Sequence, residues 1–290
     1  MKALLNIPKS VQISEIGPRD GLQNIRSFIP TGEKIEFIQL LQDTGCRKIE
    51  ITSFVNPKWI PQMRDSAEIV KHFLDSNIVK FCVLVPNKKG LELALEAGAG
   101  EVVGFLSASE IHNKNNVNKT IDESLNELSS MADLAKKNNV KIRANIATAF
   151  GYNTENTHNN VLRILKSLKS VGYEGITLCD TTGVTNPKLT YELCSEVLSL
   201  VGNIPVGIHL HQCNGMEFAN ALSALNAGIR VFESASGGLG GCPFAQGAKG
   251  NIATEYLSNM FSSMGIDTGI DSKKILSCAE YALYLQNRYV

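Results

Sequence analysis

The chain contains a pair of histidines, His209 and His211, separated by Leu210 at the end of an apolar, β-branched run. Side chains alternate between the two faces of a β-strand, so both imidazoles lie on one face and could ligate the same metal ion. A pair of hydrogen-bonded core histidines would give the same sequence pattern. The spacing therefore favours a metal site and leaves the structural alternative open.

An arginine and an aspartate stand side by side in the segment GPRDGLQN, residues 17–24, which follows another strand-like run. The carboxylate of Asp20 is a suitable ligand for a hard cation. The guanidinium of Arg19 could stabilise an oxyanion that develops during a reaction. A turn that carries a surface ion pair is the alternative interpretation.

A long glycine-rich segment, GGLGGCPFAQGAKGN, covers residues 237–251 and precedes an expected helix. Glycines allow positive φ angles and let a loop move over a substrate. Cys242, in the middle of this segment, could serve as a mobile general acid or base. Asn251, at its end, could offer an amide oxygen to a hard cation. A phosphate cradle and a flexible connector are the alternatives.

Two carboxylates, those of Glu50 and Asp180, stand within or at the end of further strand-like runs. Each could orient a ligand or Arg19, or could accept structural hydrogen bonds. Trp59 is expected to pack a loop near the same end of the strands. Four other polar residues are expected to face solvent: Lys48, His72, His112 and His158.

Eight short apolar runs alternate with longer amphipathic stretches along the chain. The runs span residues 11–16, 47–52, 79–85, 101–106, 140–147, 175–180, 205–210 and 229–234. Such alternation indicates βαβ units and a parallel sheet. We expect residues 1–290 to form one domain, a single (β/α)8 TIM barrel with parallel strands and a mobile Gly-rich loop after the last strand.

The barrel makes sense of where the candidate residues fall, because active sites in such barrels lie at the carboxyl ends of the strands. An open doubly wound sheet is the structural alternative. It is disfavoured because no Gly-rich dinucleotide fingerprint follows the first run.

The composition excludes several classes of protein. The chain has 28 Lys plus Arg and 28 Asp plus Glu, so it lacks the basic excess that is typical of nucleic-acid-binding proteins. It shows no signal-peptide pattern and no run of about 18 apolar residues that could span a membrane. Seven cysteines, an odd number without a CxxC pair, indicate reduced thiols. We therefore expect a cytoplasmic protein that binds neither nucleic acid nor membrane.

Three long motifs make the chain resemble the 3-hydroxy-3-methylglutaryl-CoA lyase family. They are IGPRDGLQN at 16–24, IEITSFVNPKWIPQMRD at 49–65 and GGLGGCPFAQGAKGNIATE at 237–255. LCDTTGV at 178–184 and the His-x-His strand occur in the same order, so the resemblance covers essentially the whole chain. It implies a barrel enzyme that cleaves 3-hydroxy-3-methylglutaryl-CoA, or a close 3-hydroxy-3-alkyl acyl-CoA, to acetyl-CoA and acetoacetate.

The resemblance also implies a Mg²⁺ or Mn²⁺ cofactor and roles for particular residues. The implied metal ligands are Asp20, His209, His211 and Asn251. The implied catalytic residues are Arg19, Cys242, His209, Asp180 and Glu50. Arg19 would steady an enolate, Cys242 and His209 would move protons, and Asp180 would share in the proton transfer. The implied substrate-binding residues are Arg19, Gln23, Lys114 and Asn115, with Lys114 near a CoA phosphate.

The chain departs from the family pattern at three places. Gln212 and Tyr256 stand where acidic residues are usual, and the segment 150–154 replaces one that usually includes Cys-Pro. These departures affect the predicted substrate more than the reaction type, because the implied ligands and Cys242 are present. A condensing enzyme that joins acetyl-CoA to a 2-oxo acid and a catalytically weakened acyl-CoA-binding relative are the alternatives. The family further implies a homodimer.

Overall fold

Eight parallel strands close into a barrel in the order in which they occur along the chain. The computed structural model describes residues 7–75, 78–241 and 250–289. The strands are β1 (Gln12–Glu15), β2 (Lys48–Ser53), β3 (Lys80–Leu84), β4 (Glu101–Ser107), β5 (Lys141–Ala147), β6 (Ile176–Asp180), β7 (Val206–Leu210) and β8 (Val231–Ser234). Each lies within or almost within the run predicted from the sequence, so the predicted barrel is confirmed. That residues 1–290 form one domain remains a prediction.

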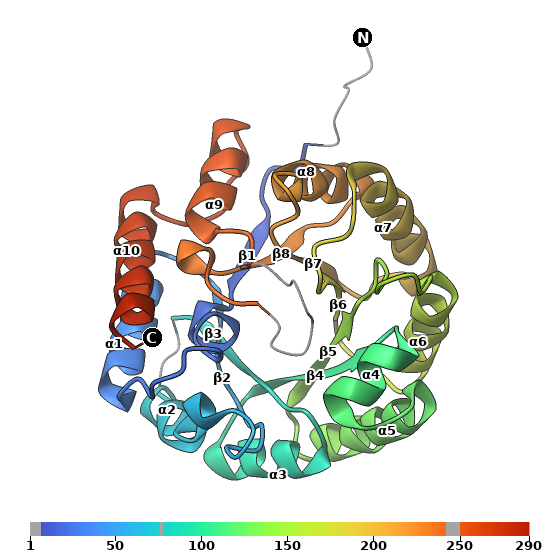
Figure 1. Ribbon diagram of the computed structural model, residues 1–290, viewed down its shortest axis with the longest axis horizontal. Helices are drawn as coiled ribbons and strands as arrows, with labels where there is room; N and C mark the ends of the chain where they lie inside the picture. Colours follow the sequence, from blue (N-terminus) through green and yellow to red (C-terminus); the bar gives the residue numbers. More distant parts are fainter. Residues whose placement is uncertain (1–6, 76–77, 242–249, 290) are drawn as a thin grey trace.

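Helices surround the barrel on all sides (Figure 1). They are α1 (Thr31–Asp43), α2 (Ser66–His72), α3 (Lys88–Ala97), α4 (Glu110–Val117), α5 (Ile121–Lys137), α6 (His158–Ser170), α7 (Pro187–Val201), α8 (Glu217–Ala227), α9 (Thr254–Ser263) and α10 (Ser272–Arg288). The short α4 is an addition between β4 and α5. In the described part of the chain, no helix has the length and apolar character needed to cross a membrane.

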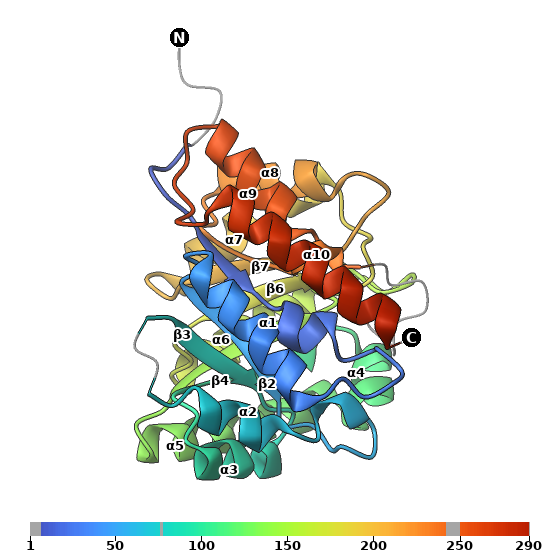
Figure 2. The same cartoon turned by 90° about the vertical axis from the view of Figure 1, so that its left-hand side faces the viewer.

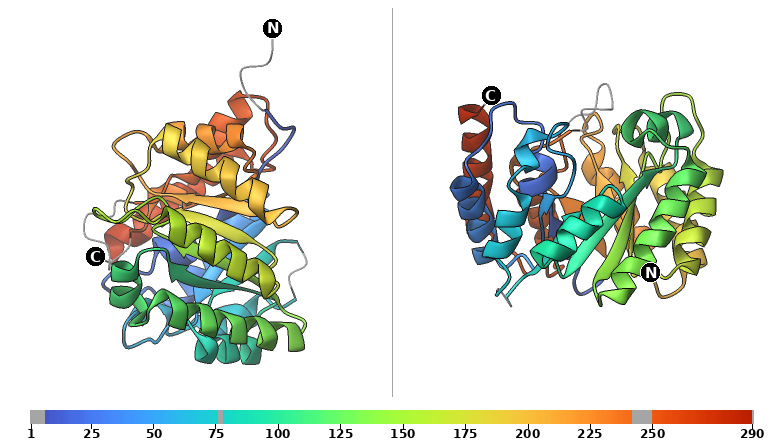
Figure 3. Two further views of the ribbon diagram at one scale, coloured as in Figure 1. Left: turned by 90° about the vertical axis from the view of Figure 1, so that its right-hand side faces the viewer. Right: turned by 90° about the horizontal axis from the view of Figure 1, so that it is seen from below.

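The last helix, α10, lies beside α1 and completes the ring of helices (Figure 2). Its buried face includes Ile275, Ala282 and Leu285, while Phe37 of α1 lies with its ring centroid 6.2 Å from that of Tyr281. Figure 3 shows the same ring from two further sides, with the helices packed along the outside of the sheet. Burial of these apolar faces against the strands provides the main driving force for folding.

Charged side chains lie inside the barrel near the N-terminal ends of its strands. All six residues of β2 are buried, and Lys48 at its start forms an ion pair with Glu101 of β4. The Arg143 side chain of β5 lies 3.4 Å from the same carboxylate. The prediction that Lys48 faces solvent was therefore wrong, because in a closed barrel one face of each strand points inward.

The loops that follow β1 and β2 are tied to each other by polar side chains. The Gln62 amide accepts a hydrogen bond from the backbone N–H of Ile29 (3.1 Å) and donates one to the carbonyl of Ile25 (2.8 Å). The Lys34 ammonium lies 2.9 and 3.0 Å from the two carboxylate oxygens of Asp65 and 4.3 Å from the ring centroid of Phe28. These contacts fix the relative positions of two segments that border the pocket described below.

We predict that Lys34→Met lowers the free energy of unfolding by about 3 kcal/mol, because it leaves the buried Asp65 carboxylate without its cation. Urea unfolding followed by circular dichroism measures the change. Lys89→Met is the matched control, since Lys89 forms an exposed pair with Glu92 at 3.7 Å. That variant should lose less than about 1 kcal/mol. Equal losses in the two variants would contradict the assigned role of the buried pair.

Candidate active site

The segment after β1 folds into a π-helical turn, Gly17–Gly21, that presents Arg19 and Asp20 at the mouth of the barrel. The backbone N–H of Asp20 donates to the carbonyl of Ile16 (2.8 Å), and that of Leu22 donates to the carbonyl of Gly17 (3.0 Å). A Cβ at position 17 would lie 2.6 Å from a carboxylate oxygen of Glu15, so a larger residue there would displace that carboxylate. Wide turns of this kind are often found at functional sites.

Asp20, His209 and His211 form a buried cluster whose ligand atoms all lie within 4.8 Å of one another. The two histidines point to the same side of β7, and their Nε2 atoms are 3.0 Å apart. Asn251, which the antiparallel bridge to His211 holds in place, donates from Nδ2 to the Asp20 carboxylate (2.7 Å). The four predicted metal ligands therefore come together, although they occur in three distant parts of the sequence.

The donor set fits a divalent metal ion. Carboxylate and amide oxygens with two imidazole nitrogens suit Mg²⁺ or Mn²⁺, which prefer oxygen-rich, near-octahedral surroundings. Asn251 Oδ1 is buried and has no hydrogen-bond partner among the described residues. A buried acceptor without a partner costs free energy, and a cation at this place would satisfy it.

Arg19 lies between two carboxylates. Its Nε donates to Glu50 and its Nη1 donates to Asp20. Burial opposes the charge of Arg19, but Glu50 and Asp20 together raise its pKa above the ordinary value. Burial also opposes the charge of Asp20, whereas Arg19, His209 and His211 hold its pKa below the ordinary value. Glu50 thus contacts and orients Arg19, which is one of the three roles that the sequence left open.

Glu233 of β8 belongs to this site and was missed in the sequence. It lies beside His209 in the β7–β8 register, and its Oε2 is 3.2 Å from His209 Nδ1. Burial works against its charge, but the His209 hydrogen bond and the nearby Arg143 hold its pKa at about 2. The sequence feature that could have identified Glu233 is a carboxylate within an otherwise apolar strand.

Asp180 stands at the end of β6 and holds the turn that follows. Its carboxylate accepts hydrogen bonds from the backbone N–H groups of Val184 (2.9 Å) and Thr185 (3.3 Å). Burial raises the pKa of Asp180 to about 6, although these two hydrogen bonds act in the opposite direction. Its neighbours Cys179 and Thr181 line the pocket.

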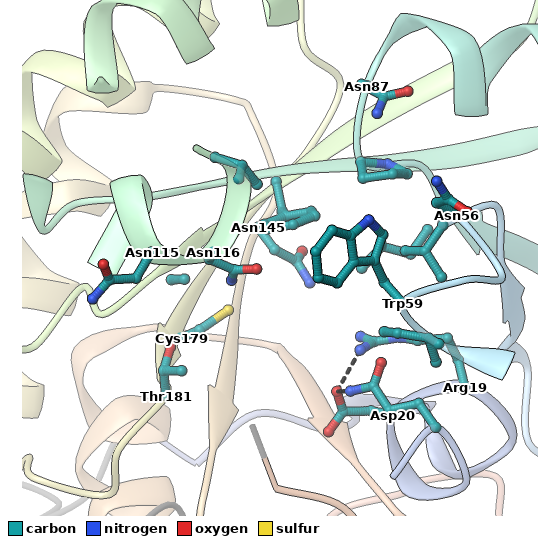
Figure 4. A pocket seen from close by; sticks show the side chains of 18 of the residues that line it. Arg19, Asp20, Asn56, Trp59, Asn87, Asn115, Asn116, Asn145, Cys179 and Thr181 are labelled. Atoms are coloured by element: carbon teal, nitrogen blue, oxygen red, sulfur yellow. Dashed lines mark hydrogen bonds and ion pairs between the residues drawn. The ribbon is translucent and has the colours of Figure 1, made fainter. Parts of the chain in front are cut away.

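Asp20, His209 and His211 line a pocket of about 480 Å³ (Figure 4). The other residues that line it include Arg19, Gln23, Trp59, Asn115, Asn145 and Lys119. Gln23 also donates to the Asp20 carboxylate (2.9 Å). Two of the predicted substrate-binding residues, Gln23 and Asn115, line the pocket. The predicted Lys114 is not among the described lining residues, and Lys119 is.

Several expectations about single residues need correction. Trp59 is 77% exposed and lines the pocket, so it does not serve mainly to pack a loop. His112 is buried rather than solvent-facing, with its ring centroid 5.1 Å from that of Tyr152. Gln212 and Tyr256, two of the departures from the family, are both exposed, unlike the predicted metal ligands. The predicted catalytic Cys242 lies in 242–249, outside the described residues.

The chain is similar to known proteins over nearly its whole length. The sequence model of the HMGL-like family matches residues 10–281. Over 276 residues, 94% of this chain and 92% of the relative, it is 42% identical to hydroxymethylglutaryl-CoA lyase of Bacillus subtilis strain 168. It is 40% identical to the human mitochondrial hydroxymethylglutaryl-CoA lyase over 284 residues, 97% of this chain and 87% of the relative.

Solved structures agree with these sequence relatives. The crystal structure of the Bacillus subtilis HMG-CoA lyase has a TM-score of 0.92 at 41% identity, covering 97% of this chain and 95% of that one. An HMG-CoA lyase from Acinetobacter baumannii, solved in complex with coenzyme A and 3-methylmalate, also has a TM-score of 0.92, at 36% identity. The alignment with it covers 96% of this chain and 92% of that one.

We predict that Asp180→Asn changes how stability depends on pH. The folded-state pKa of about 6 lies above the ordinary 3.8, so the folded protein holds this proton more tightly than the unfolded chain does. The resulting stabilisation is present below about pH 4 and is lost as the pH rises through about 6. The free energy of unfolding of the wild type, relative to Asp180→Asn, should therefore fall by on the order of 2 kcal/mol from pH 4 to pH 7.

Urea titrations at several pH values measure this difference. Asp133→Asn is the control, because Asp133 is an exposed aspartate on α5. A constant difference between the wild type and Asp180→Asn across this pH range would contradict the assignment.

Proposed function

The chain belongs to the HMGL-like family, and we propose that this carbon–carbon lyase cleaves 3-hydroxy-3-methylglutaryl-CoA, or a close 3-hydroxy-3-alkyl acyl-CoA, to acetyl-CoA and acetoacetate. The observation that carries the proposal is the convergence of Asp20, His209 and His211 in one buried cluster, lining a pocket that Arg19 also lines. The relatives of this chain that are 40–42% identical are named hydroxymethylglutaryl-CoA lyases. The related Acinetobacter enzyme was solved with coenzyme A.

A divalent cation is part of the proposal, with Mg²⁺ or Mn²⁺ as the candidates. The residues that would hold it are Asp20, His209, His211 and Asn251. When bound, such an ion would act as a Lewis acid that lowers the pKa of the substrate hydroxyl and orients it. The side chains around the pocket supply the remaining parts of the reaction.

The reaction requires a base at the substrate hydroxyl and an acid at the departing carbon. The hydroxyl proton leaves its oxygen, the oxygen lone pair forms the ketone, and the electrons of the broken carbon–carbon bond pass into the enolate of the thioester. A proton then adds to the enolate carbon and gives acetyl-CoA. Asp180, at the end of the strand beside β7, is proposed to accept the hydroxyl proton, because burial raises its pKa to about 6. His209 lines the pocket and is proposed as a ligand of the cation, since both ring nitrogens are engaged when Nδ1 donates to Glu233 and Nε2 binds the metal.

Arg19 is proposed to stabilise the enolate oxygen. A guanidinium has five N–H donors, and the contacts to Glu50 and Asp20 use Nε and Nη1. The group can therefore donate to a substrate while the two carboxylates keep it in place. A charged donor fixed before the reaction costs no reorganisation when the negative charge develops.

Cys242 is proposed as the acid that protonates the enolate carbon. This role comes from the resemblance of the glycine-rich motif to that of the lyases, and the thiol is the only ionisable group of the segment GGCPFAQGA, residues 240–248. General acid catalysis by a positioned side chain contributes about 10²- to 10⁴-fold to rates.

The walls of the pocket suit a long, polar acyl carrier. Trp59 offers an exposed indole on one side, and Asn115 and Asn116 of α4 face the pocket from another (Figure 4). Lys119 lines the pocket with its ammonium paired to Glu127, and it is proposed to meet a CoA phosphate in place of the exposed Lys114. We also propose that the protein forms a homodimer, as the resemblance to the family implies, and that it lies in the cytoplasm. Relatives of similar identity include one named cytoplasmic and others named mitochondrial.

We predict that the purified protein, loaded with Mg²⁺ or Mn²⁺, releases acetoacetate and acetyl-CoA from 3-hydroxy-3-methylglutaryl-CoA. A chelator should abolish the release, and added metal should restore it, because the hydroxyl proton is not removed without the cation. Absence of cleavage by folded, metal-loaded protein would reject the named substrate. Consumption of acetyl-CoA in the presence of a 2-oxo acid would then support the condensing alternative.

We predict that Cys242→Ala lowers kcat by about 10²- to 10⁴-fold, because the acid for the enolate is lost. Cys278→Ala is the matched control, since Cys278 is a buried thiol on α10. Its kcat should stay within about twofold of the wild type, because a structural thiol behaves as a small apolar residue. A kcat of Cys242→Ala equal to that of the control would assign the acid to another group.

A further inference from the structure

Glu233 receives hydrogen bonds on both carboxylate oxygens. Thr177 Oγ1 donates to Oε1 at 2.9 Å and Arg143 Nη2 donates to the same oxygen at 3.0 Å. The other oxygen, Oε2, lies 3.2 Å from His209 Nδ1 and 3.4 Å from Asn145 Nδ2. The side chain is buried, so its position is set by these four partners from β5, β6 and β7.

The contacts to Glu233 determine how His209 presents its ring. Thr177, Arg143 and Asn145 all donate to this carboxylate, so Glu233 serves as the acceptor here and the Nδ1 proton is assigned to His209, which donates to Oε2. In the neutral ring the lone pair then lies on Nε2, which is 3.0 Å from His211 Nε2 and within 4.8 Å of the Asp20 carboxylate. This is the tautomer that a histidine needs to bind a metal ion through Nε2.

The carboxylate is itself anchored from the other end of the barrel. Arg143, which donates to Glu233, lies 3.4 Å from the carboxylate of Glu101, and Glu101 pairs with Lys48. Cationic and anionic side chains thus alternate from Lys48, near the N-terminal ends of the strands, to His209. Because each charge is held between opposite charges, Glu233 has little freedom to move away from His209.

We propose that Glu233 is a positioning residue that fixes the tautomer and the ring orientation of His209 and so sets the affinity of the site for its divalent cation. The inference rests on the metal site in the proposed function. It adds to that function a residue outside the four proposed ligands. Partners of this kind change metal affinity by about 10- to 100-fold when they are removed.

Glu233→Gln keeps the shape of the side chain and removes its charge. Glutamine has one acceptor oxygen and one donor amide, so it cannot accept all four hydrogen bonds. The oxygen is expected to stay with the Arg143 guanidinium, which leaves the amide facing His209. His209 must then accept at Nδ1 and carry its proton on Nε2, where it blocks the metal.

The experiment measures Mn²⁺ affinity at fixed pH by electron paramagnetic resonance of the free ion, together with the absorption spectrum of the Co²⁺-loaded protein. Glu233→Gln should weaken Mn²⁺ binding by about 10- to 100-fold and change the Co²⁺ spectrum. Glu233→Asp, which keeps the carboxylate on a shorter side chain, should recover part of the affinity. Circular dichroism and thermal unfolding verify that each variant is folded.

Glu101→Gln is the matched control, because Glu101 is also a buried barrel glutamate that contacts Arg143 but lies one step farther from His209. Its Mn²⁺ affinity should stay within about threefold of the wild type. An unchanged affinity in Glu233→Gln, or an equal loss in Glu101→Gln, would overturn the inference. If Glu233→Gln does not fold, wild-type affinity in Glu233→Asp would overturn it and a partial loss would support it.

The same titration separates this inference from the proposed function. Failure of the wild-type protein to bind Mn²⁺ would remove the proposed metal site and the inference together. Normal wild-type binding that is unaffected by Glu233→Gln would remove the inference alone.

Discussion

The pairing of the first strand with the last is the contact on which the rest of the structure depends. β1 and β8 run in parallel from the Gln12–Val231 pair to the Glu15–Ser234 pair, which closes the barrel. The buried Glu15 strengthens this seam, because its carboxylate accepts from the hydroxyls of Ser236 (2.8 Å) and Thr254 (2.7 Å). Closure brings Asp20 within hydrogen-bond distance of Asn251, 231 positions away. The proposed metal site therefore exists only in the closed barrel.

A closed barrel filled with charged side chains must neutralise those charges, since an unpaired ion in a dry interior costs several kcal/mol. In this barrel, charged side chains are placed between side chains of opposite charge. Glu101 lies between Lys48 and Arg143, Glu233 lies between Arg143 and His209, and Arg19 lies between Glu50 and Asp20. The same pairing that makes burial tolerable also fixes donors and acceptors in advance, and such preorganisation favours catalysis.

The sequence by itself determined the architecture and most of the proposed ligand set. The eight β-branched runs alternate with helical stretches strongly enough to predict every strand, because strand and helix periods are local properties of the chain. The His209-Leu210-His211 spacing predicted two imidazoles on one side of a strand, and the structure confirms that geometry. The three motifs gave the family, which the relatives confirm.

Only the tertiary structure decided which side chains meet. Lys48 and His112 look like surface residues in sequence, yet both are buried, because strand closure and helix packing place them inside. Glu233 has no local signal for its contact with His209, since that contact depends on the β7–β8 register. Lys119, two residues past the end of α4, lines the pocket, whereas Lys114 within that helix does not. The local sequence pattern therefore determined the helices and strands. The packing of distant helices and strands determined the site, because contacts between residues far apart in sequence produce no periodic pattern in the chain.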